Sequence, residues 1–185
     1  SISAYMGSLG AALGSMVANL SSHKPGWDSR CGYFSEWAEK GESLMYELLH
    51  LVDEDTNAFN KIMDALGMPK GNDTEKAARA AALQEATLYA TQVPLRTMEV
   101  SYKAFDVVEA MAKEGNPNSV SDAGVGALAA RSAVLGAFLN VKINAAGLKD
   151  RAAAESLIAQ ATDIAAKAQE REKEIIAIVD QKICE

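Results

Sequence analysis

The hydrophobic and polar positions of this chain follow the period of an α-helix along most of its length. Apolar residues recur every three or four positions, and few β-branched residues alternate as they would in strands. Proline and glycine gather in three stretches, SSHKPGWDSRCG, GMPKGNDTEK and EGNPNSVSDAG, which read as loops. The pattern predicts an all-α bundle of about five long helices, over residues 2–21, 31–66, 74–114, 120–147 and 150–183.

Two positions mark the predicted third helix. Thr74, followed by Glu75, is a plausible N-cap for it. Pro94 lies inside the same helix, where proline removes a backbone donor and its ring clashes with the preceding turn. We therefore expect a kink near Val93.

The first predicted helix has two different faces. The large-residue face consists of Ile2, Met6, Leu9, Leu13, Met16 and Leu20. The small-residue face consists of Ser3, Gly7, Gly10, Ala11, Gly14 and Ala18. Each glycine inside a helix costs about 1 kcal/mol relative to alanine, so a close approach of another backbone or of a flat ligand must offset this cost.

The fourth predicted helix offers a matching sector of small residues bracketed by polar ones. Its members are Asp122, Gly126, Ala129, Ala133, Ala137, Asn140 and Asn144. Two interpretations stay open: tight packing of the two helices, with the asparagines bonded across the interface, or a surface that lines a ligand. Buried amide groups need hydrogen-bond partners in either case.

One acidic residue interrupts the apolar stripe of the second predicted helix. The stripe consists of Leu44, Leu48, Leu51, Val52, Phe59, Ile62 and Leu66, and Asp55 lies at its centre. Desolvation favours the protonated form of a carboxyl group, and a buried acid that keeps its proton can serve as a general acid. Asp55 is therefore the predicted catalytic residue, whereas Asp53 and Glu54 point toward a solvated face.

Other interpretations of the polar residues compete with this one. Asp55 could instead be neutralised by Arg131, Arg96 or Arg79, or could cap a neighbouring helix. Four further candidates are weaker: Glu85 in the third helix, His23 and Lys24 in the loop after the first helix, and His50 beside the stripe. His23 and Lys24 could meet an anionic substrate.

Composition and charge exclude several classes of function. With 185 residues, 49% of them hydrophobic, the chain can form one globular domain over residues 1–185. A net charge of −7 without a basic stripe argues against nucleic acid as a partner. Two cysteines and two histidines without clustering argue against a disulfide framework or a metal site and favour a cytoplasmic location. No phosphate-binding loop or nucleophile elbow occurs either.

The uncharged segment at residues 1–22 has about the length that spans a bilayer. Its serines and glycines, and the absence of a preceding basic region, argue against a membrane span or a signal peptide. The chain begins without methionine, which we interpret as the mark of a fragment that lacks a few N-terminal residues.

Five strings in order resemble one family along nearly the whole chain. They are LGAALGSMVANL, LVDEDTNAF, LQEA followed by VPL, GNPNSVSDAGVGA and FLNVKIN. Together they resemble the cyclodeaminase domain of formiminotransferase-cyclodeaminase and its stand-alone relative, methenyltetrahydrofolate cyclohydrolase. The resemblance implies a metal-free, dimeric helical bundle of one-carbon metabolism and histidine degradation. It also implies a tetrahydrofolate derivative as substrate and no separate cofactor.

The resemblance also implies roles for particular residues. The family's proton donor, carried over through LVDEDTNAF, falls on Asp55, the residue that the stripe had singled out. The small faces of the first and fourth helices would then receive the flat pterin ring, with Asp122, Asn140 and Asn144 as hydrogen-bond partners. Lys24 could meet the glutamate tail. The family's proline- and glycine-rich turn before the first helix and the fused transferase domain are absent from this sequence.

Three functions therefore remain open. The first is an ammonia-lyase that closes 5-formiminotetrahydrofolate to 5,10-methenyltetrahydrofolate. The second is a methenyltetrahydrofolate cyclohydrolase. The third is a non-catalytic scaffold that dimerises through its glycine faces, with Asp55 as a buried specificity device.

Overall fold

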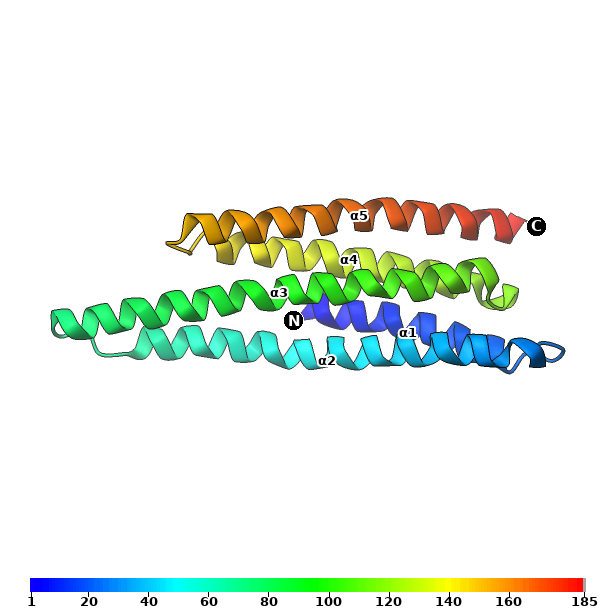
Figure 1. Cartoon of the computed structure of the whole chain (residues 1–185), viewed down its shortest axis with the longest axis horizontal. Helices are drawn as coiled ribbons and strands as arrows, with labels where there is room; N and C mark the ends of the chain where they lie inside the picture. The colour runs from blue at the N-terminus through cyan, green and yellow to red at the C-terminus, as the bar shows by residue number, and fades with distance from the viewer. Residues whose placement is uncertain (185) are drawn as a thin grey trace.

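A computed structural model describes residues 1–184, and these form five long helices that pack side by side (Figure 1). The helices are α1 (Ile2–Ser22), α2 (Cys31–Gly67), α3 (Asp73–Glu114), α4 (Val120–Ala145) and α5 (Arg151–Cys184). Two short 3-10 turns, Asp28–Arg30 and Pro117–Ser119, precede α2 and α4. The predicted all-α bundle is confirmed, with most helix ends within one residue of their predicted positions. The N-cap of α3 is Asn72 rather than Thr74, since the Asn72 side chain accepts from the Glu75 amide at 2.9 Å.

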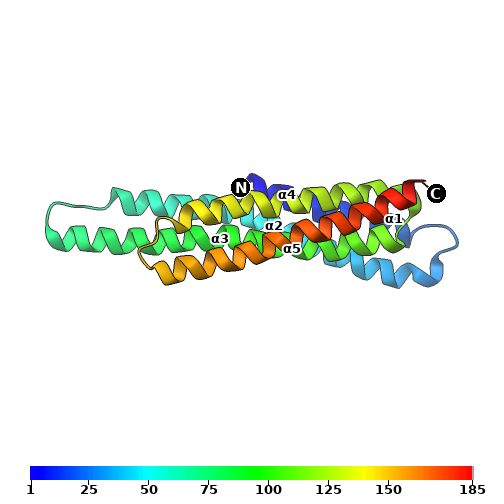
Figure 2. The same ribbon diagram turned by 90° about the horizontal axis from the view of Figure 1, so that it is seen from above.

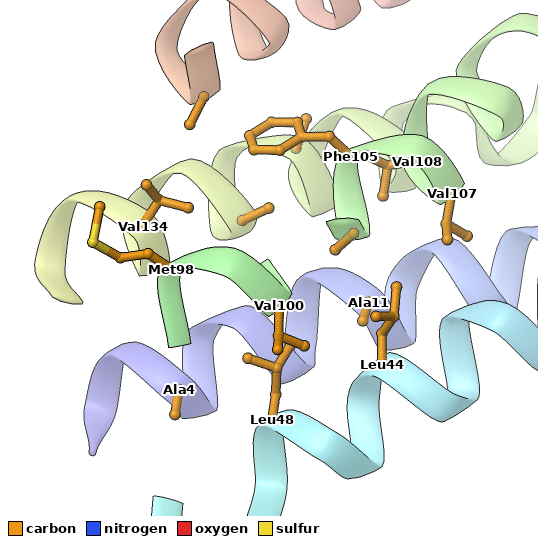
Figure 3. Close-up of a cluster of buried hydrophobic side chains, with 14 of the residues drawn as sticks. Ala4, Ala11, Leu44, Leu48, Met98, Val100, Phe105, Val107, Val108 and Val134 are labelled. Carbon is orange, nitrogen blue, oxygen red and sulfur yellow. The ribbon is translucent and has the colours of Figure 1, made fainter. Parts of the chain in front are cut away.

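Helix α1 lies against three other helices, α2, α3 and α4, whereas α5 packs on α3 and α4. In both views, α2 and α3 extend well beyond the first residue of α1 (Figures 1 and 2). The core between α1, α2, α3 and α4 is built from alanine, valine and a few larger side chains, among them Leu48, Met98 and Phe105 (Figure 3). One side of α1 remains outside this core and faces away from the other helices.

The small-residue face of α1 brings its backbone into close contact with α4. A Cβ atom added to Gly10 would lie 2.8 Å from the carbonyl oxygen of Gly126 and 3.1 Å from the amide nitrogen of Ala130. A Cβ added to Gly126 would lie 2.8 Å from Cγ1 of Val108. The glycines therefore allow tight helix packing, which was one of the two interpretations left open. The prediction that a pterin ring lies between these faces is wrong, because backbone atoms occupy the space.

Pro94 lies within α3, which continues as one helix through this position. Because proline has no N–H group, the carbonyl of Ala90 lacks its normal helical donor. Asn144 of α4 fills that role, since its Nδ2 donates to the Ala90 oxygen at 2.7 Å. The bond satisfies a mostly buried carbonyl and fastens α4 to α3 at the proline.

The segment Pro117–Ala145 is long and apolar enough, by length and composition alone, to cross a membrane. It contains α4, one side of which packs against α1, α3 and α5. A core helix of a water-exposed bundle passes the same test, and 44% of the apolar window is buried within the bundle.

We expect Gly10→Ala to destabilise the bundle by about 1–3 kcal/mol, because the added methyl group would press on backbone atoms that cannot move aside. Gly32→Ala is the matched control, since nothing lies within 4 Å of a Cβ added there. Urea unfolding at one fixed protein concentration measures both variants. Equal stability of the two would contradict the close contact between α1 and α4.

We expect Asn144→Ala to cost about 1–3 kcal/mol of unfolding free energy, because it leaves the Ala90 carbonyl unpaired. Asn140→Ala is the control, since the exposed Asn140 contacts only its own helix, through the Gly136 oxygen at 3.4 Å. Thermal unfolding followed by circular dichroism compares the two. A larger loss from the Asn140 variant would be inconsistent with the role given to Asn144.

Candidate functional site

Asp55 lies on α2 beside Ser1, the N-cap of α1. Its Oδ2 is 3.7 Å from the backbone nitrogen of Ser1, and its side chain is 41% exposed. The buried line of α2 runs instead through Leu44, Leu48, Leu51, Ala58 and Ala65. Asp55 is turned about 40° from Leu51 and about 60° from Ala58 at 100° per residue. Because its side chain is 41% exposed, the prediction of an acid buried within the single chain is wrong.

None of the three arginines proposed as partners pairs with Asp55. Arg96 pairs with Glu47 and Glu99, Arg131 lies 3.8 Å from Glu172, and Arg79 donates to the Leu66 carbonyl. None of these three arginines therefore supplies a cation beside the Asp55 carboxylate. The carboxylate remains open to a ligand or to another molecule.

Two large apolar side chains, each close along the chain to Asp55 or to its contact Ser1, face outward. Phe59, one turn further along α2, is 61% exposed, and Ile2 at the start of α1 is 76% exposed. On the other side of α1, Gly136 of α4 meets Ser3, and Leu139 and Ile143 follow it as exposed residues. The apolar stripe around Asp55 exists as predicted, but part of it faces solvent rather than the core.

The four predicted substrate-binding residues do not form one site within the chain. Asp122 lies in the first turn of α4, near the end of α1, because the neighbouring Asn116 amide donates to Ser21 at 2.8 Å. Asn140 lies about 27 Å further along α4, at 1.5 Å per residue. Asn144 is held by the Ala90 carbonyl, and Lys24 lies over the Trp27 ring at 4.1 Å. Only Asn140 and Asn144 are near the end of the bundle that carries Asp55.

A cavity of about 830 Å³ opens at the end of α1 that is opposite to Asp55. Its polar lining comes from α1, from the loop after it, from α2 and from the turn before α4: Asn19, His23, Lys24, Glu42, Asn116 and Asn118. Met16, Leu20 and Met45 supply an apolar part. The volume suits a small organic ligand, and three amide side chains beside one cation and one carboxylate give it mixed hydrogen-bonding character.

The sequence analysis found only part of this cavity. It singled out His23 and Lys24, but it missed Glu42, Asn116 and Asn118. The asparagines occur in the string GNPNSVSDAGVGA, which was quoted for the resemblance but not connected with the loop of Lys24. The hydrogen bond from the Asn116 backbone amide to the Ser21 side-chain hydroxyl is what brings the two loops together.

Glu54 is not part of a freely solvated face, contrary to the prediction. It accepts a short hydrogen bond from the Tyr89 hydroxyl of α3. This bond lowers the pKa of Glu54 and raises that of Tyr89. Tyr89 also lines a second cavity of about 490 Å³ together with the exposed Glu85. His50 is largely exposed and lies 3.7 Å from Glu54.

A separate ion-pair network fastens α5 to α3. Arg171 donates to Asp106 at 2.8 Å and to Glu109, and Lys40 of α2 adds a bond to Asp106 at 3.1 Å. Burial acts to raise the pKa of Asp106, but the hydrogen bonds from Arg171 and Lys40 outweigh it and lower the pKa. The network joins α2, α3 and α5, and Asp55 is not one of its members. Within residues 1–184, no three His, Cys, Asp or Glu side chains converge as a metal site would require.

Comparisons with known proteins agree with the architecture. The family model described as formiminotransferase-cyclodeaminase matches residues 1–163. A protein of Methylorubrum extorquens named methenyltetrahydrofolate cyclohydrolase is 41% identical over 97% of this chain and 86% of its own length. The formimidoyltransferase-cyclodeaminase of Mus musculus is 33% identical over 81% of this chain, which spans only 28% of that longer protein.

A solved structure shares the fold. The formiminotetrahydrofolate cyclodeaminase of Thermotoga maritima superposes with a TM-score of 0.85 over 98% of this chain and 87% of that one, at 22% identity. The same family is indicated by the helix order, by the matched family model and by the relative at 41% identity. The chain belongs to the formiminotransferase-cyclodeaminase family, and it is an enzyme of its cyclodeaminase and cyclohydrolase branch.

Proposed function

We propose that this protein is a methenyltetrahydrofolate cyclohydrolase, which adds water to the one-carbon bridge of 5,10-methenyltetrahydrofolate. The relative of that name supports this order of candidates, since it is 41% identical and is matched over 86% of its length. The ammonia-releasing cyclodeaminase, placed first on sequence alone, becomes the second candidate. It is supported by the relatives named formimidoyltransferase-cyclodeaminase, of which this chain spans about a third.

Both reactions pass through the same kind of intermediate. A tetrahedral carbon bonded to nitrogen collapses, and the nitrogen that leaves must take up a proton. In the hydrolysis, water adds to the bridging carbon, and the bond from that carbon to one ring nitrogen then breaks. One proton of the water ends on that nitrogen, and the other is released as the formyl carbonyl forms. In the cyclodeamination, the secondary amine nitrogen outside the pterin ring attacks the formimino carbon, and its proton passes to the formimino nitrogen. That nitrogen then takes up one more proton and leaves as ammonia.

Asp55 is the proposed carrier of that proton. The observation that supports this role is its place among outward-facing apolar side chains, with Phe59 and Ile2 close to it and no arginine paired with it. Once a ligand or a second molecule covers these side chains, water leaves the carboxyl group and the protonated acid is favoured. In the hydrolysis, the protonated Asp55 would give its proton to the leaving ring nitrogen and take up one proton of the added water as the formyl carbonyl forms, which restores the acid.

We also propose that the protein works as a homodimer. The outer face of α1 carries exposed large apolar residues at helical spacing: Ile2, Tyr5, Leu9, Met16 and Leu20. Exposed apolar stripes of this length are typical of surfaces that another molecule covers. A second copy of the same chain is the simplest occupant, because most soluble assemblies are symmetric homo-oligomers.

We expect Asp55→Asn to lower turnover by about 10²- to 10⁴-fold, because it removes the proton carrier and keeps the shape of the side chain. Asp53→Asn is the matched control, since it neutralises an exposed carboxylate on the same turn. The absorbance of 5,10-methenyltetrahydrofolate should fall when that compound is supplied. It should rise instead with 5-formiminotetrahydrofolate if the second candidate is correct.

Two outcomes would count against these assignments. Normal turnover by the Asp55 variant would remove Asp55 from the mechanism. Failure of the unaltered protein to convert either folate would remove both candidate reactions and leave the non-catalytic scaffold.

A further inference from the structure

The part of α2 that follows Asp55 lacks α1 as a neighbour. Helix α2 packs on the long helices α1 and α3, but α1 begins at Ile2, and the backbone nitrogen of Ser1 donates to the Val52 oxygen at 3.3 Å. Beyond this level α2 continues to Gly67 beside α3 (Figures 1 and 2). The Asp55 carboxylate therefore lies where the support of α2 changes from two helices to one.

The buried side chains of this stretch of α2 are small. They are Ala58 and Ala65, with the half-buried Ile62 between them. Alanine side chains form shallow ridges, which bring two helices close but resist little when one helix turns about its own axis. The rotation of α2 decides which way Asp55 points, so directional bonds to α3 are needed to fix it.

Tyr89 of α3 makes such a bond to the residue before Asp55. Its hydroxyl donates to Oε2 of Glu54. The other oxygen of Glu54 has neighbours on α2 itself, Asn57 at 3.4 Å and His50 at 3.7 Å, and contacts within one helix do not fix its rotation against another. Among the side chains of residues 1–184, the hydroxyl of Tyr89 alone joins the Glu54 carboxylate to α3 by a hydrogen bond.

Charge keeps this bond in place at neutral pH. The bond lowers the pKa of Glu54 and raises the pKa of Tyr89, so the acceptor is charged while the donor keeps its proton. Lys61 of α2 lies over the Tyr89 ring, with its Nζ 3.8 Å from the ring centroid, which is a cation–π contact. Helix α2 therefore holds Tyr89 at two places, the hydroxyl and the ring face, from residues about two turns apart.

Two other bonds between α2 and α3 lie farther from Asp55. Arg96 pairs with Glu47, about 12 Å before Asp55 along α2 at 1.5 Å per residue. Arg79 donates to the Leu66 carbonyl at 3.2 Å, about 17 Å after Asp55. The Tyr89 bond is made by the residue next to Asp55, so it acts on the turn that carries the acid.

We propose that Tyr89 is a positioning residue for Asp55: by holding Glu54 against α3, it fixes the rotation of α2 at which the Asp55 carboxyl group lies beside Ser1. The proposal rests on the proposed function of Asp55 and adds the residue that orients it. Glu54 and Asp55 differ by 100° around the helix, so a bond that holds the first against α3 directs the second to another side. A misplacement of about 1 Å can cost about 10²-fold in rate, so a bond outside the reacting atoms is able to control turnover.

Removing one hydroxyl group tests the proposal. Tyr89→Phe should lower kcat for 5,10-methenyltetrahydrofolate by about 10-fold and leave KM nearly unchanged, because the substrate still binds while the acid is less well oriented. Tyr46→Phe is the matched control, since Tyr46 is a 60% exposed tyrosine of α2. Both variants should keep the thermal midpoint within about 2 °C of the wild type, because exposed bonds add little to global stability. A wild-type kcat for Tyr89→Phe would overturn the proposal.

Two combinations separate orientation of Asp55 from a merely structural role. Glu54→Gln keeps an oxygen that accepts from Tyr89 and should keep most of the activity, whereas Glu54→Ala should lose as much as Tyr89→Phe. In an Asp55→Asn background, Tyr89→Phe should not lower the residual turnover further, since the group that it orients is absent. A further 10-fold loss in that background, or equal losses from the two Glu54 variants, would contradict the proposed role.

Amide hydrogen exchange followed by mass spectrometry does not depend on the reaction. Tyr89→Phe should speed the exchange of residues 53–66 and leave α1 and α4 unchanged, because the bond holds only this part of α2. If the unaltered protein converted neither folate, this result would remain and only the proposed function would fail. Unchanged exchange in residues 53–66 would overturn the proposal whatever the activity.

Discussion

The close contact between the backbones of α1 and α4 is the constraint on which the rest of the structure depends. Gly10 and Gly126 leave no room for a side chain between the helices, and Val108 of α3 closes the same space from the other side. Because the small-residue face of α1 is buried against α4, its large-residue face must point outward. The exposed apolar stripe is thus a consequence of how the core is packed.

This arrangement changes where the chemistry can occur. A site between α1 and α4 is excluded by packing, and two of the places that remain are the surfaces at the two ends of α1. Asp55 occupies one of them, in apolar surroundings that are only half covered, and the polar cavity with Lys24 occupies the other. Covering the outer face of α1 would exclude water from the acid, which is why the proposed dimer and the proposed chemistry are linked.

The sequence was sufficient to predict the helices, but it did not show which of their faces point toward the core. Helical period and the loop residues placed the five elements correctly, and the cost of Gly10 and Gly14 correctly indicated a close approach. Asp55 was expected in the core because Phe59 and Leu66 are apolar, yet both are exposed. In a sequence, an apolar residue that a partner molecule covers cannot be distinguished from one that packs in the core. The role of Asn144 was equally hidden, since it depends on the carbonyl of Ala90 that Pro94 leaves free.

A crystal structure with a bound reduced folate would test the central claim most directly. The account predicts a folate whose one-carbon bridge lies within hydrogen-bond distance of Asp55. A folate whose bridge lies away from Asp55 would contradict it.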